Sequence, residues 1–553
     1  MSTIAARIWK HQQFGYVPHT SVSGDTWTLQ QRGTTTGAGA AGGTTLVDTN
    51  GDSGLLDGFN GRYWVRCVSG DNEGLWKRVV DDTGIGTLTL EGNGFPNQVL
   101  SGVDYEVWKS PEPVVVIDTS SGETNAYDAI RTEAQDYWVG FYLVPITGTH
   151  RGKIARITAN LSGTFTLEAS FGSALAGGDV CLLRRFLEVS DVADGLTHDF
   201  AETPSYRLNG DIGDGRVLNQ GGTFGYSTEV YGSDNPSADG VAAPRNPLSH
   251  MLQAAGFDEV LNASSETDAG SAVNALECVA GAWENLGIGS MIEVCNDCAW
   301  VQSTVDGATD TVNIEPSLPL APITGQVVHT AALYRRNRLG RDGDYLGICI
   351  EHERDGIRTT MTGCKGNVVL NDGPTLALAW TLNVDHWVRE IERAPYYAGD
   401  AYPTQAPIRG TDKKAYVGTT AVDIGGLTAS LNNEVAPKAV QGANGINGRA
   451  GFAHANAAPG ATFRELLPTT DDLARYQDFL TRSAFALYVI YGSSPGNYFG
   501  LRIANGRLVQ DTKPEDASGM VDHASVIAAH DAGTTTDGGD TLYVVDDFSM
   551  SFA

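Results

Sequence analysis

The chain has 553 residues, and 66 acidic residues against 37 basic ones give it a formal net charge of −29. This balance argues against a surface that grips a nucleic-acid backbone or an anionic membrane, because both tasks need clusters of Lys and Arg. No stretch approaches the roughly 18 uninterrupted apolar residues of a membrane helix, and the start shows no signal-peptide pattern. We therefore expect synthesis in a cytoplasm and no membrane partner.

The length exceeds what one hydrophobic core can fill, so several domains are expected. The 67 Gly residues favour β-structure with tight turns. Seven Cys residues, an odd number without a spacing framework, favour free thiols in a reducing compartment.

Residues 1–43 are expected to form an N-terminal arm followed by a connector, the latter because 33–43 is rich in Gly, Ala and Thr. Aromatic residues within 8–16 follow no clear period. Two interpretations stay open for this arm: a frayed terminus, or a segment that packs on a neighbouring subunit.

A five-residue motif then recurs along the chain. Thr-Leu-Thr-Leu-Glu at 87–91 returns as Thr-Phe-Thr-Leu-Glu at 164–168 and, more loosely, as Thr-Val-Asn-Ile-Glu at 311–315. Reuse of one small β unit is typical of a construction part rather than an enzyme. The predicted β repeat modules are 44–112, 113–190 and an inserted copy at about 281–337.

The copies also share features outside the motif. Tyr-Trp-Val opens the first two copies, at 63–65 and 137–139, and an apolar-basic ending closes the third at 333–336. The paired aromatic residues suit either stacking on carbohydrate or the core of each module, and their matching positions favour the core. A short helix is expected at 127–134.

Residues 191–391 change character. A strand is predicted at 223–230, and the best helix signal spans 246–257, where Asn246 can cap the helix, Pro247 fits its first turn and Gly256 ends it. The strands predicted after the insertion are 346–351, 356–361, 363–370 and 376–382. The three prolines of 392–412 indicate a linker.

Residues 413–553 repeat the order of 205–390 more weakly. Gly-rich 445–452 parallels 221–226, a second helix opens near 470, and strands follow at 485–491, 501–509 and 541–548. The pattern predicts two related β-domains in tandem, 191–391 and 413–553, with an insertion in the first.

The strand at 223–231, the helix from Asn-Pro-Leu to Ala-Ala-Gly-Phe at 246–257 and the strand Thr-Met-Thr-Gly-Cys-Lys-Gly-Asn-Val at 360–368 follow one another in an informative order. In this order residues 195–553 resemble the tail tube proteins of long-tailed bacteriophages. The resemblance implies a mainly β fold of two tandem tail-tube-like β-sandwich or barrel domains, with two or three small β repeat modules and few short helices.

The resemblance also implies a function. Such proteins are virion structural proteins that self-associate into rings, and stacked rings form the tail tube through which DNA passes without specific binding. The implied location is the virion tail, and the implied partners are the tape measure, terminator and tail-tip proteins. Two tube-like domains per chain predict a trimer with pseudo-sixfold symmetry, with a hexamer as the alternative, and an acidic channel wall would repel DNA phosphates.

Two other functions are weighed against this one. The first is a tail-tip or fibre-type protein whose tryptophan-bearing modules bind a host surface glycan. The second is an enzyme such as a glycoside hydrolase, which needs two placed carboxylates that a sequence cannot demonstrate.

Candidate chemical motifs are few. Cys295 and Cys298 form a C-x-x-C without a second metal-binding pair, and the D-x-N-x-D stretch that begins at Asp48 lacks the calcium-loop Glu. His352 stands between Glu351 and Glu353 without a nucleophile motif, which favours an alternating, exposed strand. We predict no catalytic, cofactor-binding or metal-binding residue and no cofactor.

Overall fold

The structure is a computed structural model of the 553-residue chain. The residues it describes are 12–19, 26–49, 61–82, 86–118, 122–201, 216–232, 245–261, 264–279, 289–305, 309–336, 346–354, 356–391, 406–418, 420–438, 451–465, 477–478, 480–512, 523–529, 534–537, 540–544 and 548–552. This part of the chain is mainly β, as the sequence predicts, and its one named helix is α2 (Ser249–Ala254).

Three six-stranded modules occur in the described residues. Module 1 contains β2 (Thr28–Thr34), β3 (Thr45–Val47), β4 (Tyr63–Cys67), β5 (Trp76–Asp82), β6 (Thr87–Leu90) and β7 (Asp104–Lys109). Module 2 contains β8 (Val114–Val116), β9 (Asn125–Tyr127), β10 (Tyr142–Pro145), β11 (Ala155–Leu161), β12 (Thr164–Leu167) and β13 (Val180–Phe186). Module 3 contains β17 (Ser265–Glu266), β18 (Ala275–Val279), β19 (Met291–Val294), β20 (Asp297–Val305), β21 (Thr309–Glu315) and β22 (Val327–Thr330).

The three modules share one strand order. In each, the antiparallel ladder runs through the first, sixth, third, fourth, fifth and second strand of the module. The recurring motif supplies the fifth strand every time, as β6, β12 and β21. The loose third copy at 311–315 is therefore a structural repeat of the first two.

The module boundaries differ from those expected. Module 1 begins with β2, inside the segment 1–43 that was expected to be arm and connector, and module 3 begins with β17, ahead of residue 281. Residues 333–336 do not end the third copy. They lie in β23 (Ala332–Arg336), which pairs with β16 (Phe257–Val260) and lies outside the six-stranded sheet of module 3.

Two tandem domains make up the rest of the described chain. The first contains β1 (Gln12–Pro18), β14 (Ser190–Ala201), β15 (Arg216–Glu229), β24 (Ile348–Arg354), β25 (Ile357–Asp372), β26 (Leu376–Val384) and β27 (His386–Ile391). The second contains β28 (Lys413–Val417), β30 (Ile424–Ser430), β33 (Gly460–Glu465), β34 (Phe485–Ser494), β35 (Asn497–Thr512), β36 (His523–Ala529) and β39 (Phe548–Phe552).

The tandem domains also share one strand order. In the first domain β14, β15, β26 and β25 follow one another, the start of β25 also pairs with β24 and β27, and β24 pairs with β1. In the second domain β30, β33, β36 and β35 do the same, the start of β35 pairs with β34 and β39, and β34 pairs with β28. The weak duplication in the sequence thus corresponds to a duplicated topology.

The shared strand order makes β1, which lies in the segment expected to be an arm, a strand of the first domain. The seven residues of β1 pair with β24 along their whole length, as β28 pairs with β34 in the second domain. Tyr16 and Val17 are fully buried, so this part of the expected arm is an integral strand of its own chain.

Modules 1 and 2 are inserted into a hairpin of the first domain. In the second domain, β28 and β29 (Thr420–Val422) pair with only residues 418 and 419 between them, and β30 follows at once. In the first domain β13 takes the place of β29, because it pairs with β1 and leads into β14. Module 1 and the first five strands of module 2 lie between β1 and β13, and β13 belongs to both the module and the hairpin. Module 3 lies between β16 and β23, which pair with each other, and β23 also pairs with β39 of the second domain.

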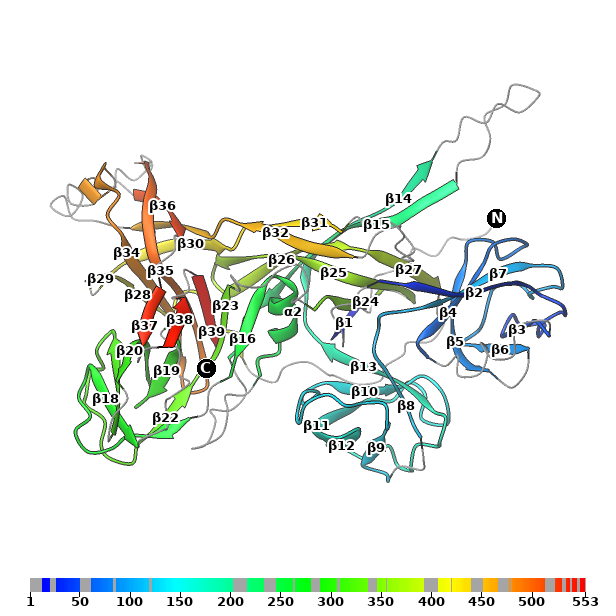
Figure 1. Ribbon diagram of the computed structural model, residues 1–553, viewed down its shortest axis with the longest axis horizontal. Helices are drawn as coiled ribbons and strands as arrows, with labels where there is room; N and C mark the ends of the chain where they lie inside the picture. The colour runs from blue at the N-terminus through cyan, green and yellow to red at the C-terminus, as the bar shows by residue number, and fades with distance from the viewer. Residues whose placement is uncertain are drawn as a thin grey trace, which may run out of the picture.

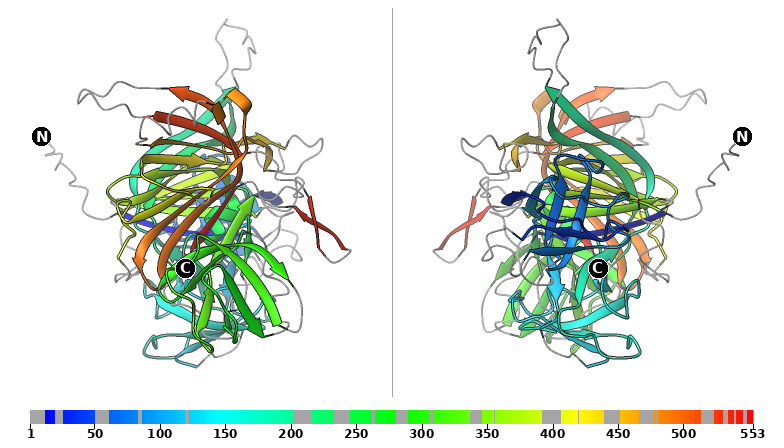
Figure 2. Two further views of the ribbon diagram at one scale, coloured as in Figure 1. Left: turned by 90° about the vertical axis from the view of Figure 1, so that its left-hand side faces the viewer. Right: turned by 90° about the vertical axis from the view of Figure 1, so that its right-hand side faces the viewer.

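The three modules lie around a sheet that the strands of both tandem domains form together. Figure 1 shows modules 2 and 3 below this sheet, module 1 at its right-hand end, and the β14–β15 hairpin projecting away from the body. The two side views of Figure 2 also place modules 2 and 3 on the lower side.

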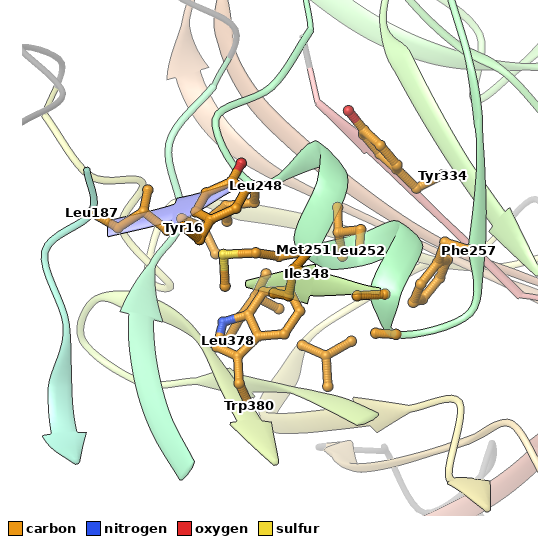
Figure 3. Packing of buried hydrophobic residues seen from close by; sticks show 14 of the residues in the cluster. Tyr16, Leu187, Leu248, Met251, Leu252, Phe257, Tyr334, Ile348, Leu378 and Trp380 are labelled. Atoms are coloured by element: carbon orange, nitrogen blue, oxygen red, sulfur yellow. The ribbon is translucent and has the colours of Figure 1, made fainter. Parts of the chain in front are cut away.

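Helix α2 lies inside the core of the first domain. Asn246 does not cap α2 as expected, because the N-cap residue is Leu248 and no side chain caps it; the Oδ1 atom of Asn246 instead accepts a 2.8 Å hydrogen bond from the Leu248 amide. Gly256, with a φ of +91°, follows the C-cap Ala255 and ends the helix as predicted. Met251 packs among the buried side chains of Tyr16 and Trp380 (Figure 3). The helix expected at 127–134 is absent: β9 ends at Tyr127, and the following residues form turns.

Candidate assembly interface

The two tandem domains are joined edge to edge. The second part of β25 pairs with β26 on one side and with β30 of the other domain on the other side, in the register Val369↔Ser430, Leu370↔Ala429 and Asn371↔Thr428. One sheet therefore crosses both domains in the order β14, β15, β26, β25, β30, β33, β36 and β35.

Side chains strengthen this joint. The Oγ atom of Ser430 donates a 2.9 Å hydrogen bond to the Val368 carbonyl, and the Nδ2 atom of Asn367 donates a 3.1 Å bond to the same hydroxyl. Asp372, the last residue of β25, accepts a bond from the Leu427 amide and forms an ion pair with Lys413 of β28. The end of β25 is thus fastened to both β28 and β30.

Both outer edges of the continuous sheet are open within the described residues. β14 pairs with β15 alone, and β35 beyond Gly506 pairs with β36 alone. Unpaired backbone N–H and C=O groups along such edges are a template for another strand. The open edge of β14 corresponds to the edge of β30 that pairs with β25, and the open edge of β35 corresponds to the edge of β25 that pairs with β30.

The two faces of this sheet differ in chemistry. Phe224, Tyr226 and Trp380 point into the core. The intervening positions of β15 and β26 are Thr223, Gly225, Ser227, Glu229, Ala377, Ala379, Thr381 and Asn383, and all are partly or fully exposed. Small neutral side chains dominate this open face, which carries no Lys or Arg at these positions.

Module 1 is docked on the first domain through a tryptophan cluster. Trp27, Trp64, Trp76 and Trp108 are all at least nine-tenths buried and pack with Val388 of β27. The Nε1 atom of Trp27 donates a 2.6 Å hydrogen bond to Oγ1 of Thr362 in β25. The rings of Trp27 and Trp76 also contact His386, with centroids 5.0 and 5.3 Å away.

A buried network of ion pairs continues this joint. Its members alternate in charge and come from module 1, module 2, the segment between them and the first tandem domain. In order of contact they are Lys77, Glu390, Arg358, Glu91, Arg78, Glu112, Arg184 and Glu351. The eight side chains are each at most 7% exposed, and four positive charges balance four negative ones.

Glu112 joins the two modules within this network. Its carboxylate lies 2.6 Å from Nη2 of Arg78 and also binds Arg184. Burial alone would raise the pKa of Glu112, but Arg184 and Arg78 outweigh this effect and hold the pKa below its usual value. The residue is therefore charged at neutral pH and links modules 1 and 2.

Module 3 is docked on the second domain in a similar way. Trp300 and Met291 pack with Tyr488, Ile490 and Tyr498 of β34 and β35. The Glu293 carboxylate accepts a 3.1 Å hydrogen bond from the Gly496 amide. Modules 1 and 2 thus pack on the first tandem domain, and module 3 packs on the second.

In the aromatic pairs singled out in the sequence, the tryptophans are buried and the tyrosines are partly buried. Trp64 and Trp138 are at most 1% exposed, so neither offers a platform on which a sugar could stack. They are also not equivalent in the fold. Trp64 lies in β4, whereas Trp138 precedes β10, where Tyr142 takes the Trp64 position because it pairs with Arg184 as Trp64 pairs with Trp108.

The candidate metal motifs have structural surroundings. Cys295 and Asn296 have positive φ angles and form the turn between β19 and β20, with Cys295 exposed and Cys298 buried. Asp48 is buried and accepts a 2.6 Å hydrogen bond from Tyr105, while residues 50–53 lie outside the described part. In that part no three His, Cys, Asp or Glu side chains are grouped so as to hold a metal ion.

His352 lies on a covered strand, not on an exposed one as expected. Glu351, His352 and Glu353 are at most 8% exposed, because β1 and β25 flank β24 and side chains pack on both of its faces. Burial and the nearby Arg354 lower the pKa of His352 to about 4. Glu351 serves the ion-pair network through Arg184.

No known protein family matches this chain, and no curated protein shows significant sequence similarity to it. In the described residues no helix is long and apolar enough to cross a membrane.

Proposed function

We propose that this protein is a virion structural protein that forms the stacked rings of a bacteriophage tail tube. The observation that carries the proposal is the joint between β25 and β30, together with the open edges of β14 and β35. A chain that joins two similar domains edge to edge, and leaves the matching edges open at both ends, is suited to head-to-tail closure into a ring.

The number of chains in the ring follows from the duplication. Each chain brings two domains of the same topology, so three chains supply six domains around one axis. The favoured assembly is a trimer with pseudo-sixfold symmetry, and a hexamer of chains is the alternative.

The open face of the continuous sheet is the candidate channel wall. Its exposed positions on β15 and β26 carry Thr, Gly, Ser, Ala and Asn with a single carboxylate, that of Glu229. These positions are mainly neutral, and the acidic wall expected from the sequence stays a prediction for the remaining strands. These positions of β15 and β26 give phosphates no Lys or Arg anchor, although the partly exposed Arg507 of β35 lies on the same face of the sheet. The two strands support passage of DNA through the lumen without specific binding.

The modules are outer decoration in this proposal. They cover the outer strands of both domains and leave the open sheet face clear. Tape measure, terminator and tail-tip proteins would meet the stacked rings in the virion tail, and synthesis takes place in the host cytoplasm. No catalytic role is proposed.

The alternative is a tail-tip or fibre-type protein that binds a host surface glycan through its modules. It has less support, because the module tryptophans Trp64, Trp76, Trp108, Trp138 and Trp300 are all at most 7% exposed.

Negative-stain electron microscopy of the purified protein, combined with the mass of isolated rings, tests the proposal. Hollow rings or tubes with three chains per ring are expected. Rings of six chains would remove the pseudo-sixfold arrangement, and monomers that bind glycan arrays would support the alternative.

A further inference from the structure

An open pocket lies beside the free edge of β14. Its volume is about 380 Å³, and its lining includes Phe14 of β1, Leu187, Val189, Ser190, and Ser227 and Glu229 of β15. The lining also contains Glu188, so the pocket combines apolar side chains with two serine hydroxyls and two carboxylates.

In the second domain, the position that corresponds to this pocket is occupied by the end of β25. There β28 takes the position of β1, and β30 takes that of β14. Asp372, at the end of β25, bridges these two strands through Lys413 and the Leu427 amide. The strand that arrives from the other domain therefore closes this place with its last residue.

We infer that the end of β35 from a second copy of this chain covers the pocket and pairs with β14, as β25 pairs with β30. This inference rests on the proposed function, because it supplies the contact that closes the ring. The partner is another copy because β35 is the strand of the chain that corresponds to β25, and its outer edge is open beyond Gly506 in the described residues.

The register follows from matching irregularities. The long strands share a bulge, from Met361 to Cys364 in β25 and from Ile503 to Gly506 in β35. Cys364 of β25 therefore corresponds to Gly506 of β35. Val369 lies five residues after Cys364, and β35 has one extra residue in a second bulge between Leu508 and Gln510. Thr512, six residues after Gly506, therefore corresponds to Val369.

The β14 side is aligned in the same way. Ser190 and Ala193 flank a bulge that corresponds to the one between Gly425 and Thr428 in β30. Gly195 therefore takes the position of Ser430. The pair Val369↔Ser430 predicts that Thr512 of one chain lies opposite Gly195 of the next. If the antiparallel register continues for two residues beyond this pair, Gln510 lies opposite Thr197.

Cysteine cross-linking tests this register. The variant carries Thr197→Cys and Gln510→Cys in a Cys295→Ser background, because Cys295 is the exposed one of the native cysteines. Gly195 is left unchanged, since a Cβ there would lie 3.0 Å from the Thr223 carbonyl oxygen. The matched control carries Asn371→Cys and Thr428→Cys, which pair within one chain.

On non-reducing denaturing gels, the Thr197/Gln510 variant should give cross-linked dimers and trimers, and the control should run as a single chain. A mixture of the two single-cysteine variants should give dimers and no larger species. Rings or tubes in the microscope with only single-chain bands would overturn the inference and leave the proposed function standing. Cross-linked trimers without rings or tubes would support the strand pairing and count against the tail tube.

Hydrogen exchange of the unmodified protein provides an independent measurement. The backbone amides of 190–197 and 507–512 should exchange at least tenfold more slowly in assembled protein than in monomers. Equal exchange in both states, with rings visible, would overturn the inference regardless of how the cysteine variants fold.

Discussion

Arg184 of module 2 and Glu351 of β24 are joined by a buried ion pair, with 2.7 Å between Nη2 and Oε2. Their contact fastens an inserted module directly to the tandem domain that carries it. The same arginine also binds Glu112, so the contact is the last link of the buried network.

Replacing Glu112 with Gln should destabilise the protein by about 3–5 kcal/mol, because it leaves Arg78 and Arg184 buried without their shared counter-charge. Chemical denaturation followed by tryptophan fluorescence measures the change. The matched control is Arg32→Ala, which breaks a pair with Glu106 whose arginine is 68% exposed and should cost less than about 1 kcal/mol. Similar losses in the two variants would contradict the importance of burial.

Trp27→Ala should loosen module 1 from the first domain. The side chain is fully buried and donates to Thr362, so its removal should cost about 3–5 kcal/mol. Limited proteolysis should then release a fragment containing module 1, whereas Leu75→Ala, at a 39% exposed position of the same module, should leave the digestion pattern unchanged. Unchanged digestion of both variants would show that the cluster does not hold the module.

His352 should make stability depend on pH. Its pKa is about 4 in the folded chain and 6.5 as an ordinary histidine, so on acidification the unfolded chain takes up the proton first. The free energy of unfolding is therefore unaffected by this group above pH 6.5 and falls between pH 6.5 and 4, by up to about 3 kcal/mol. His352→Gln should show a shallower fall over this interval when denaturation is measured at each pH. An identical slope in both proteins would count against a buried neutral histidine.

Module 3 should be removable without loss of the tandem domains. Since β16 and β23 pair directly, a short Gly-Ser turn replacing 264–331 should close them into a hairpin. The deletion exposes Tyr488, Ile490 and Tyr498, so Tyr488→Lys and Ile490→Thr are added to limit aggregation. If the module is decoration, this variant should still form rings in the microscope. Folded monomers without rings would assign module 3 a part in assembly.

Features that depend only on residues close in the sequence, such as the end of a helix, can be predicted from the sequence. Gly256 predicts the end of α2, because a residue with a positive φ ends a helix locally, whereas Asn246 lies ahead of the actual N-cap, Leu248. Gly363, with a φ of +64°, divides the sequence pattern into two predicted strands, yet β25 continues through it because a bulge absorbs the turn-like residue.

Long-range contacts could not be predicted in this way. The motif residues Glu91, Glu168 and Glu315 look equivalent in the sequence. Glu91 alone among them joins the network through Arg358, while Glu168 is exposed and Glu315 is partly buried. The difference depends on which surface each module meets. For the same reason the joint between β25 and β30 has no sequence signal, since it depends on which strand edges come together.

The insertion between β1 and β13 determines the order in which the chain can fold during synthesis. Modules 1 and 2 consist of contiguous residues, so each can fold soon after it leaves the ribosome. All seven residues of β1, from Gln12 to Pro18, pair with residues 348–354 of β24, which are synthesised after all three modules. Although β1 precedes all three modules in the chain, it is thus among the last strands to be paired, and the first tandem domain cannot close its sheet until the modules have been made.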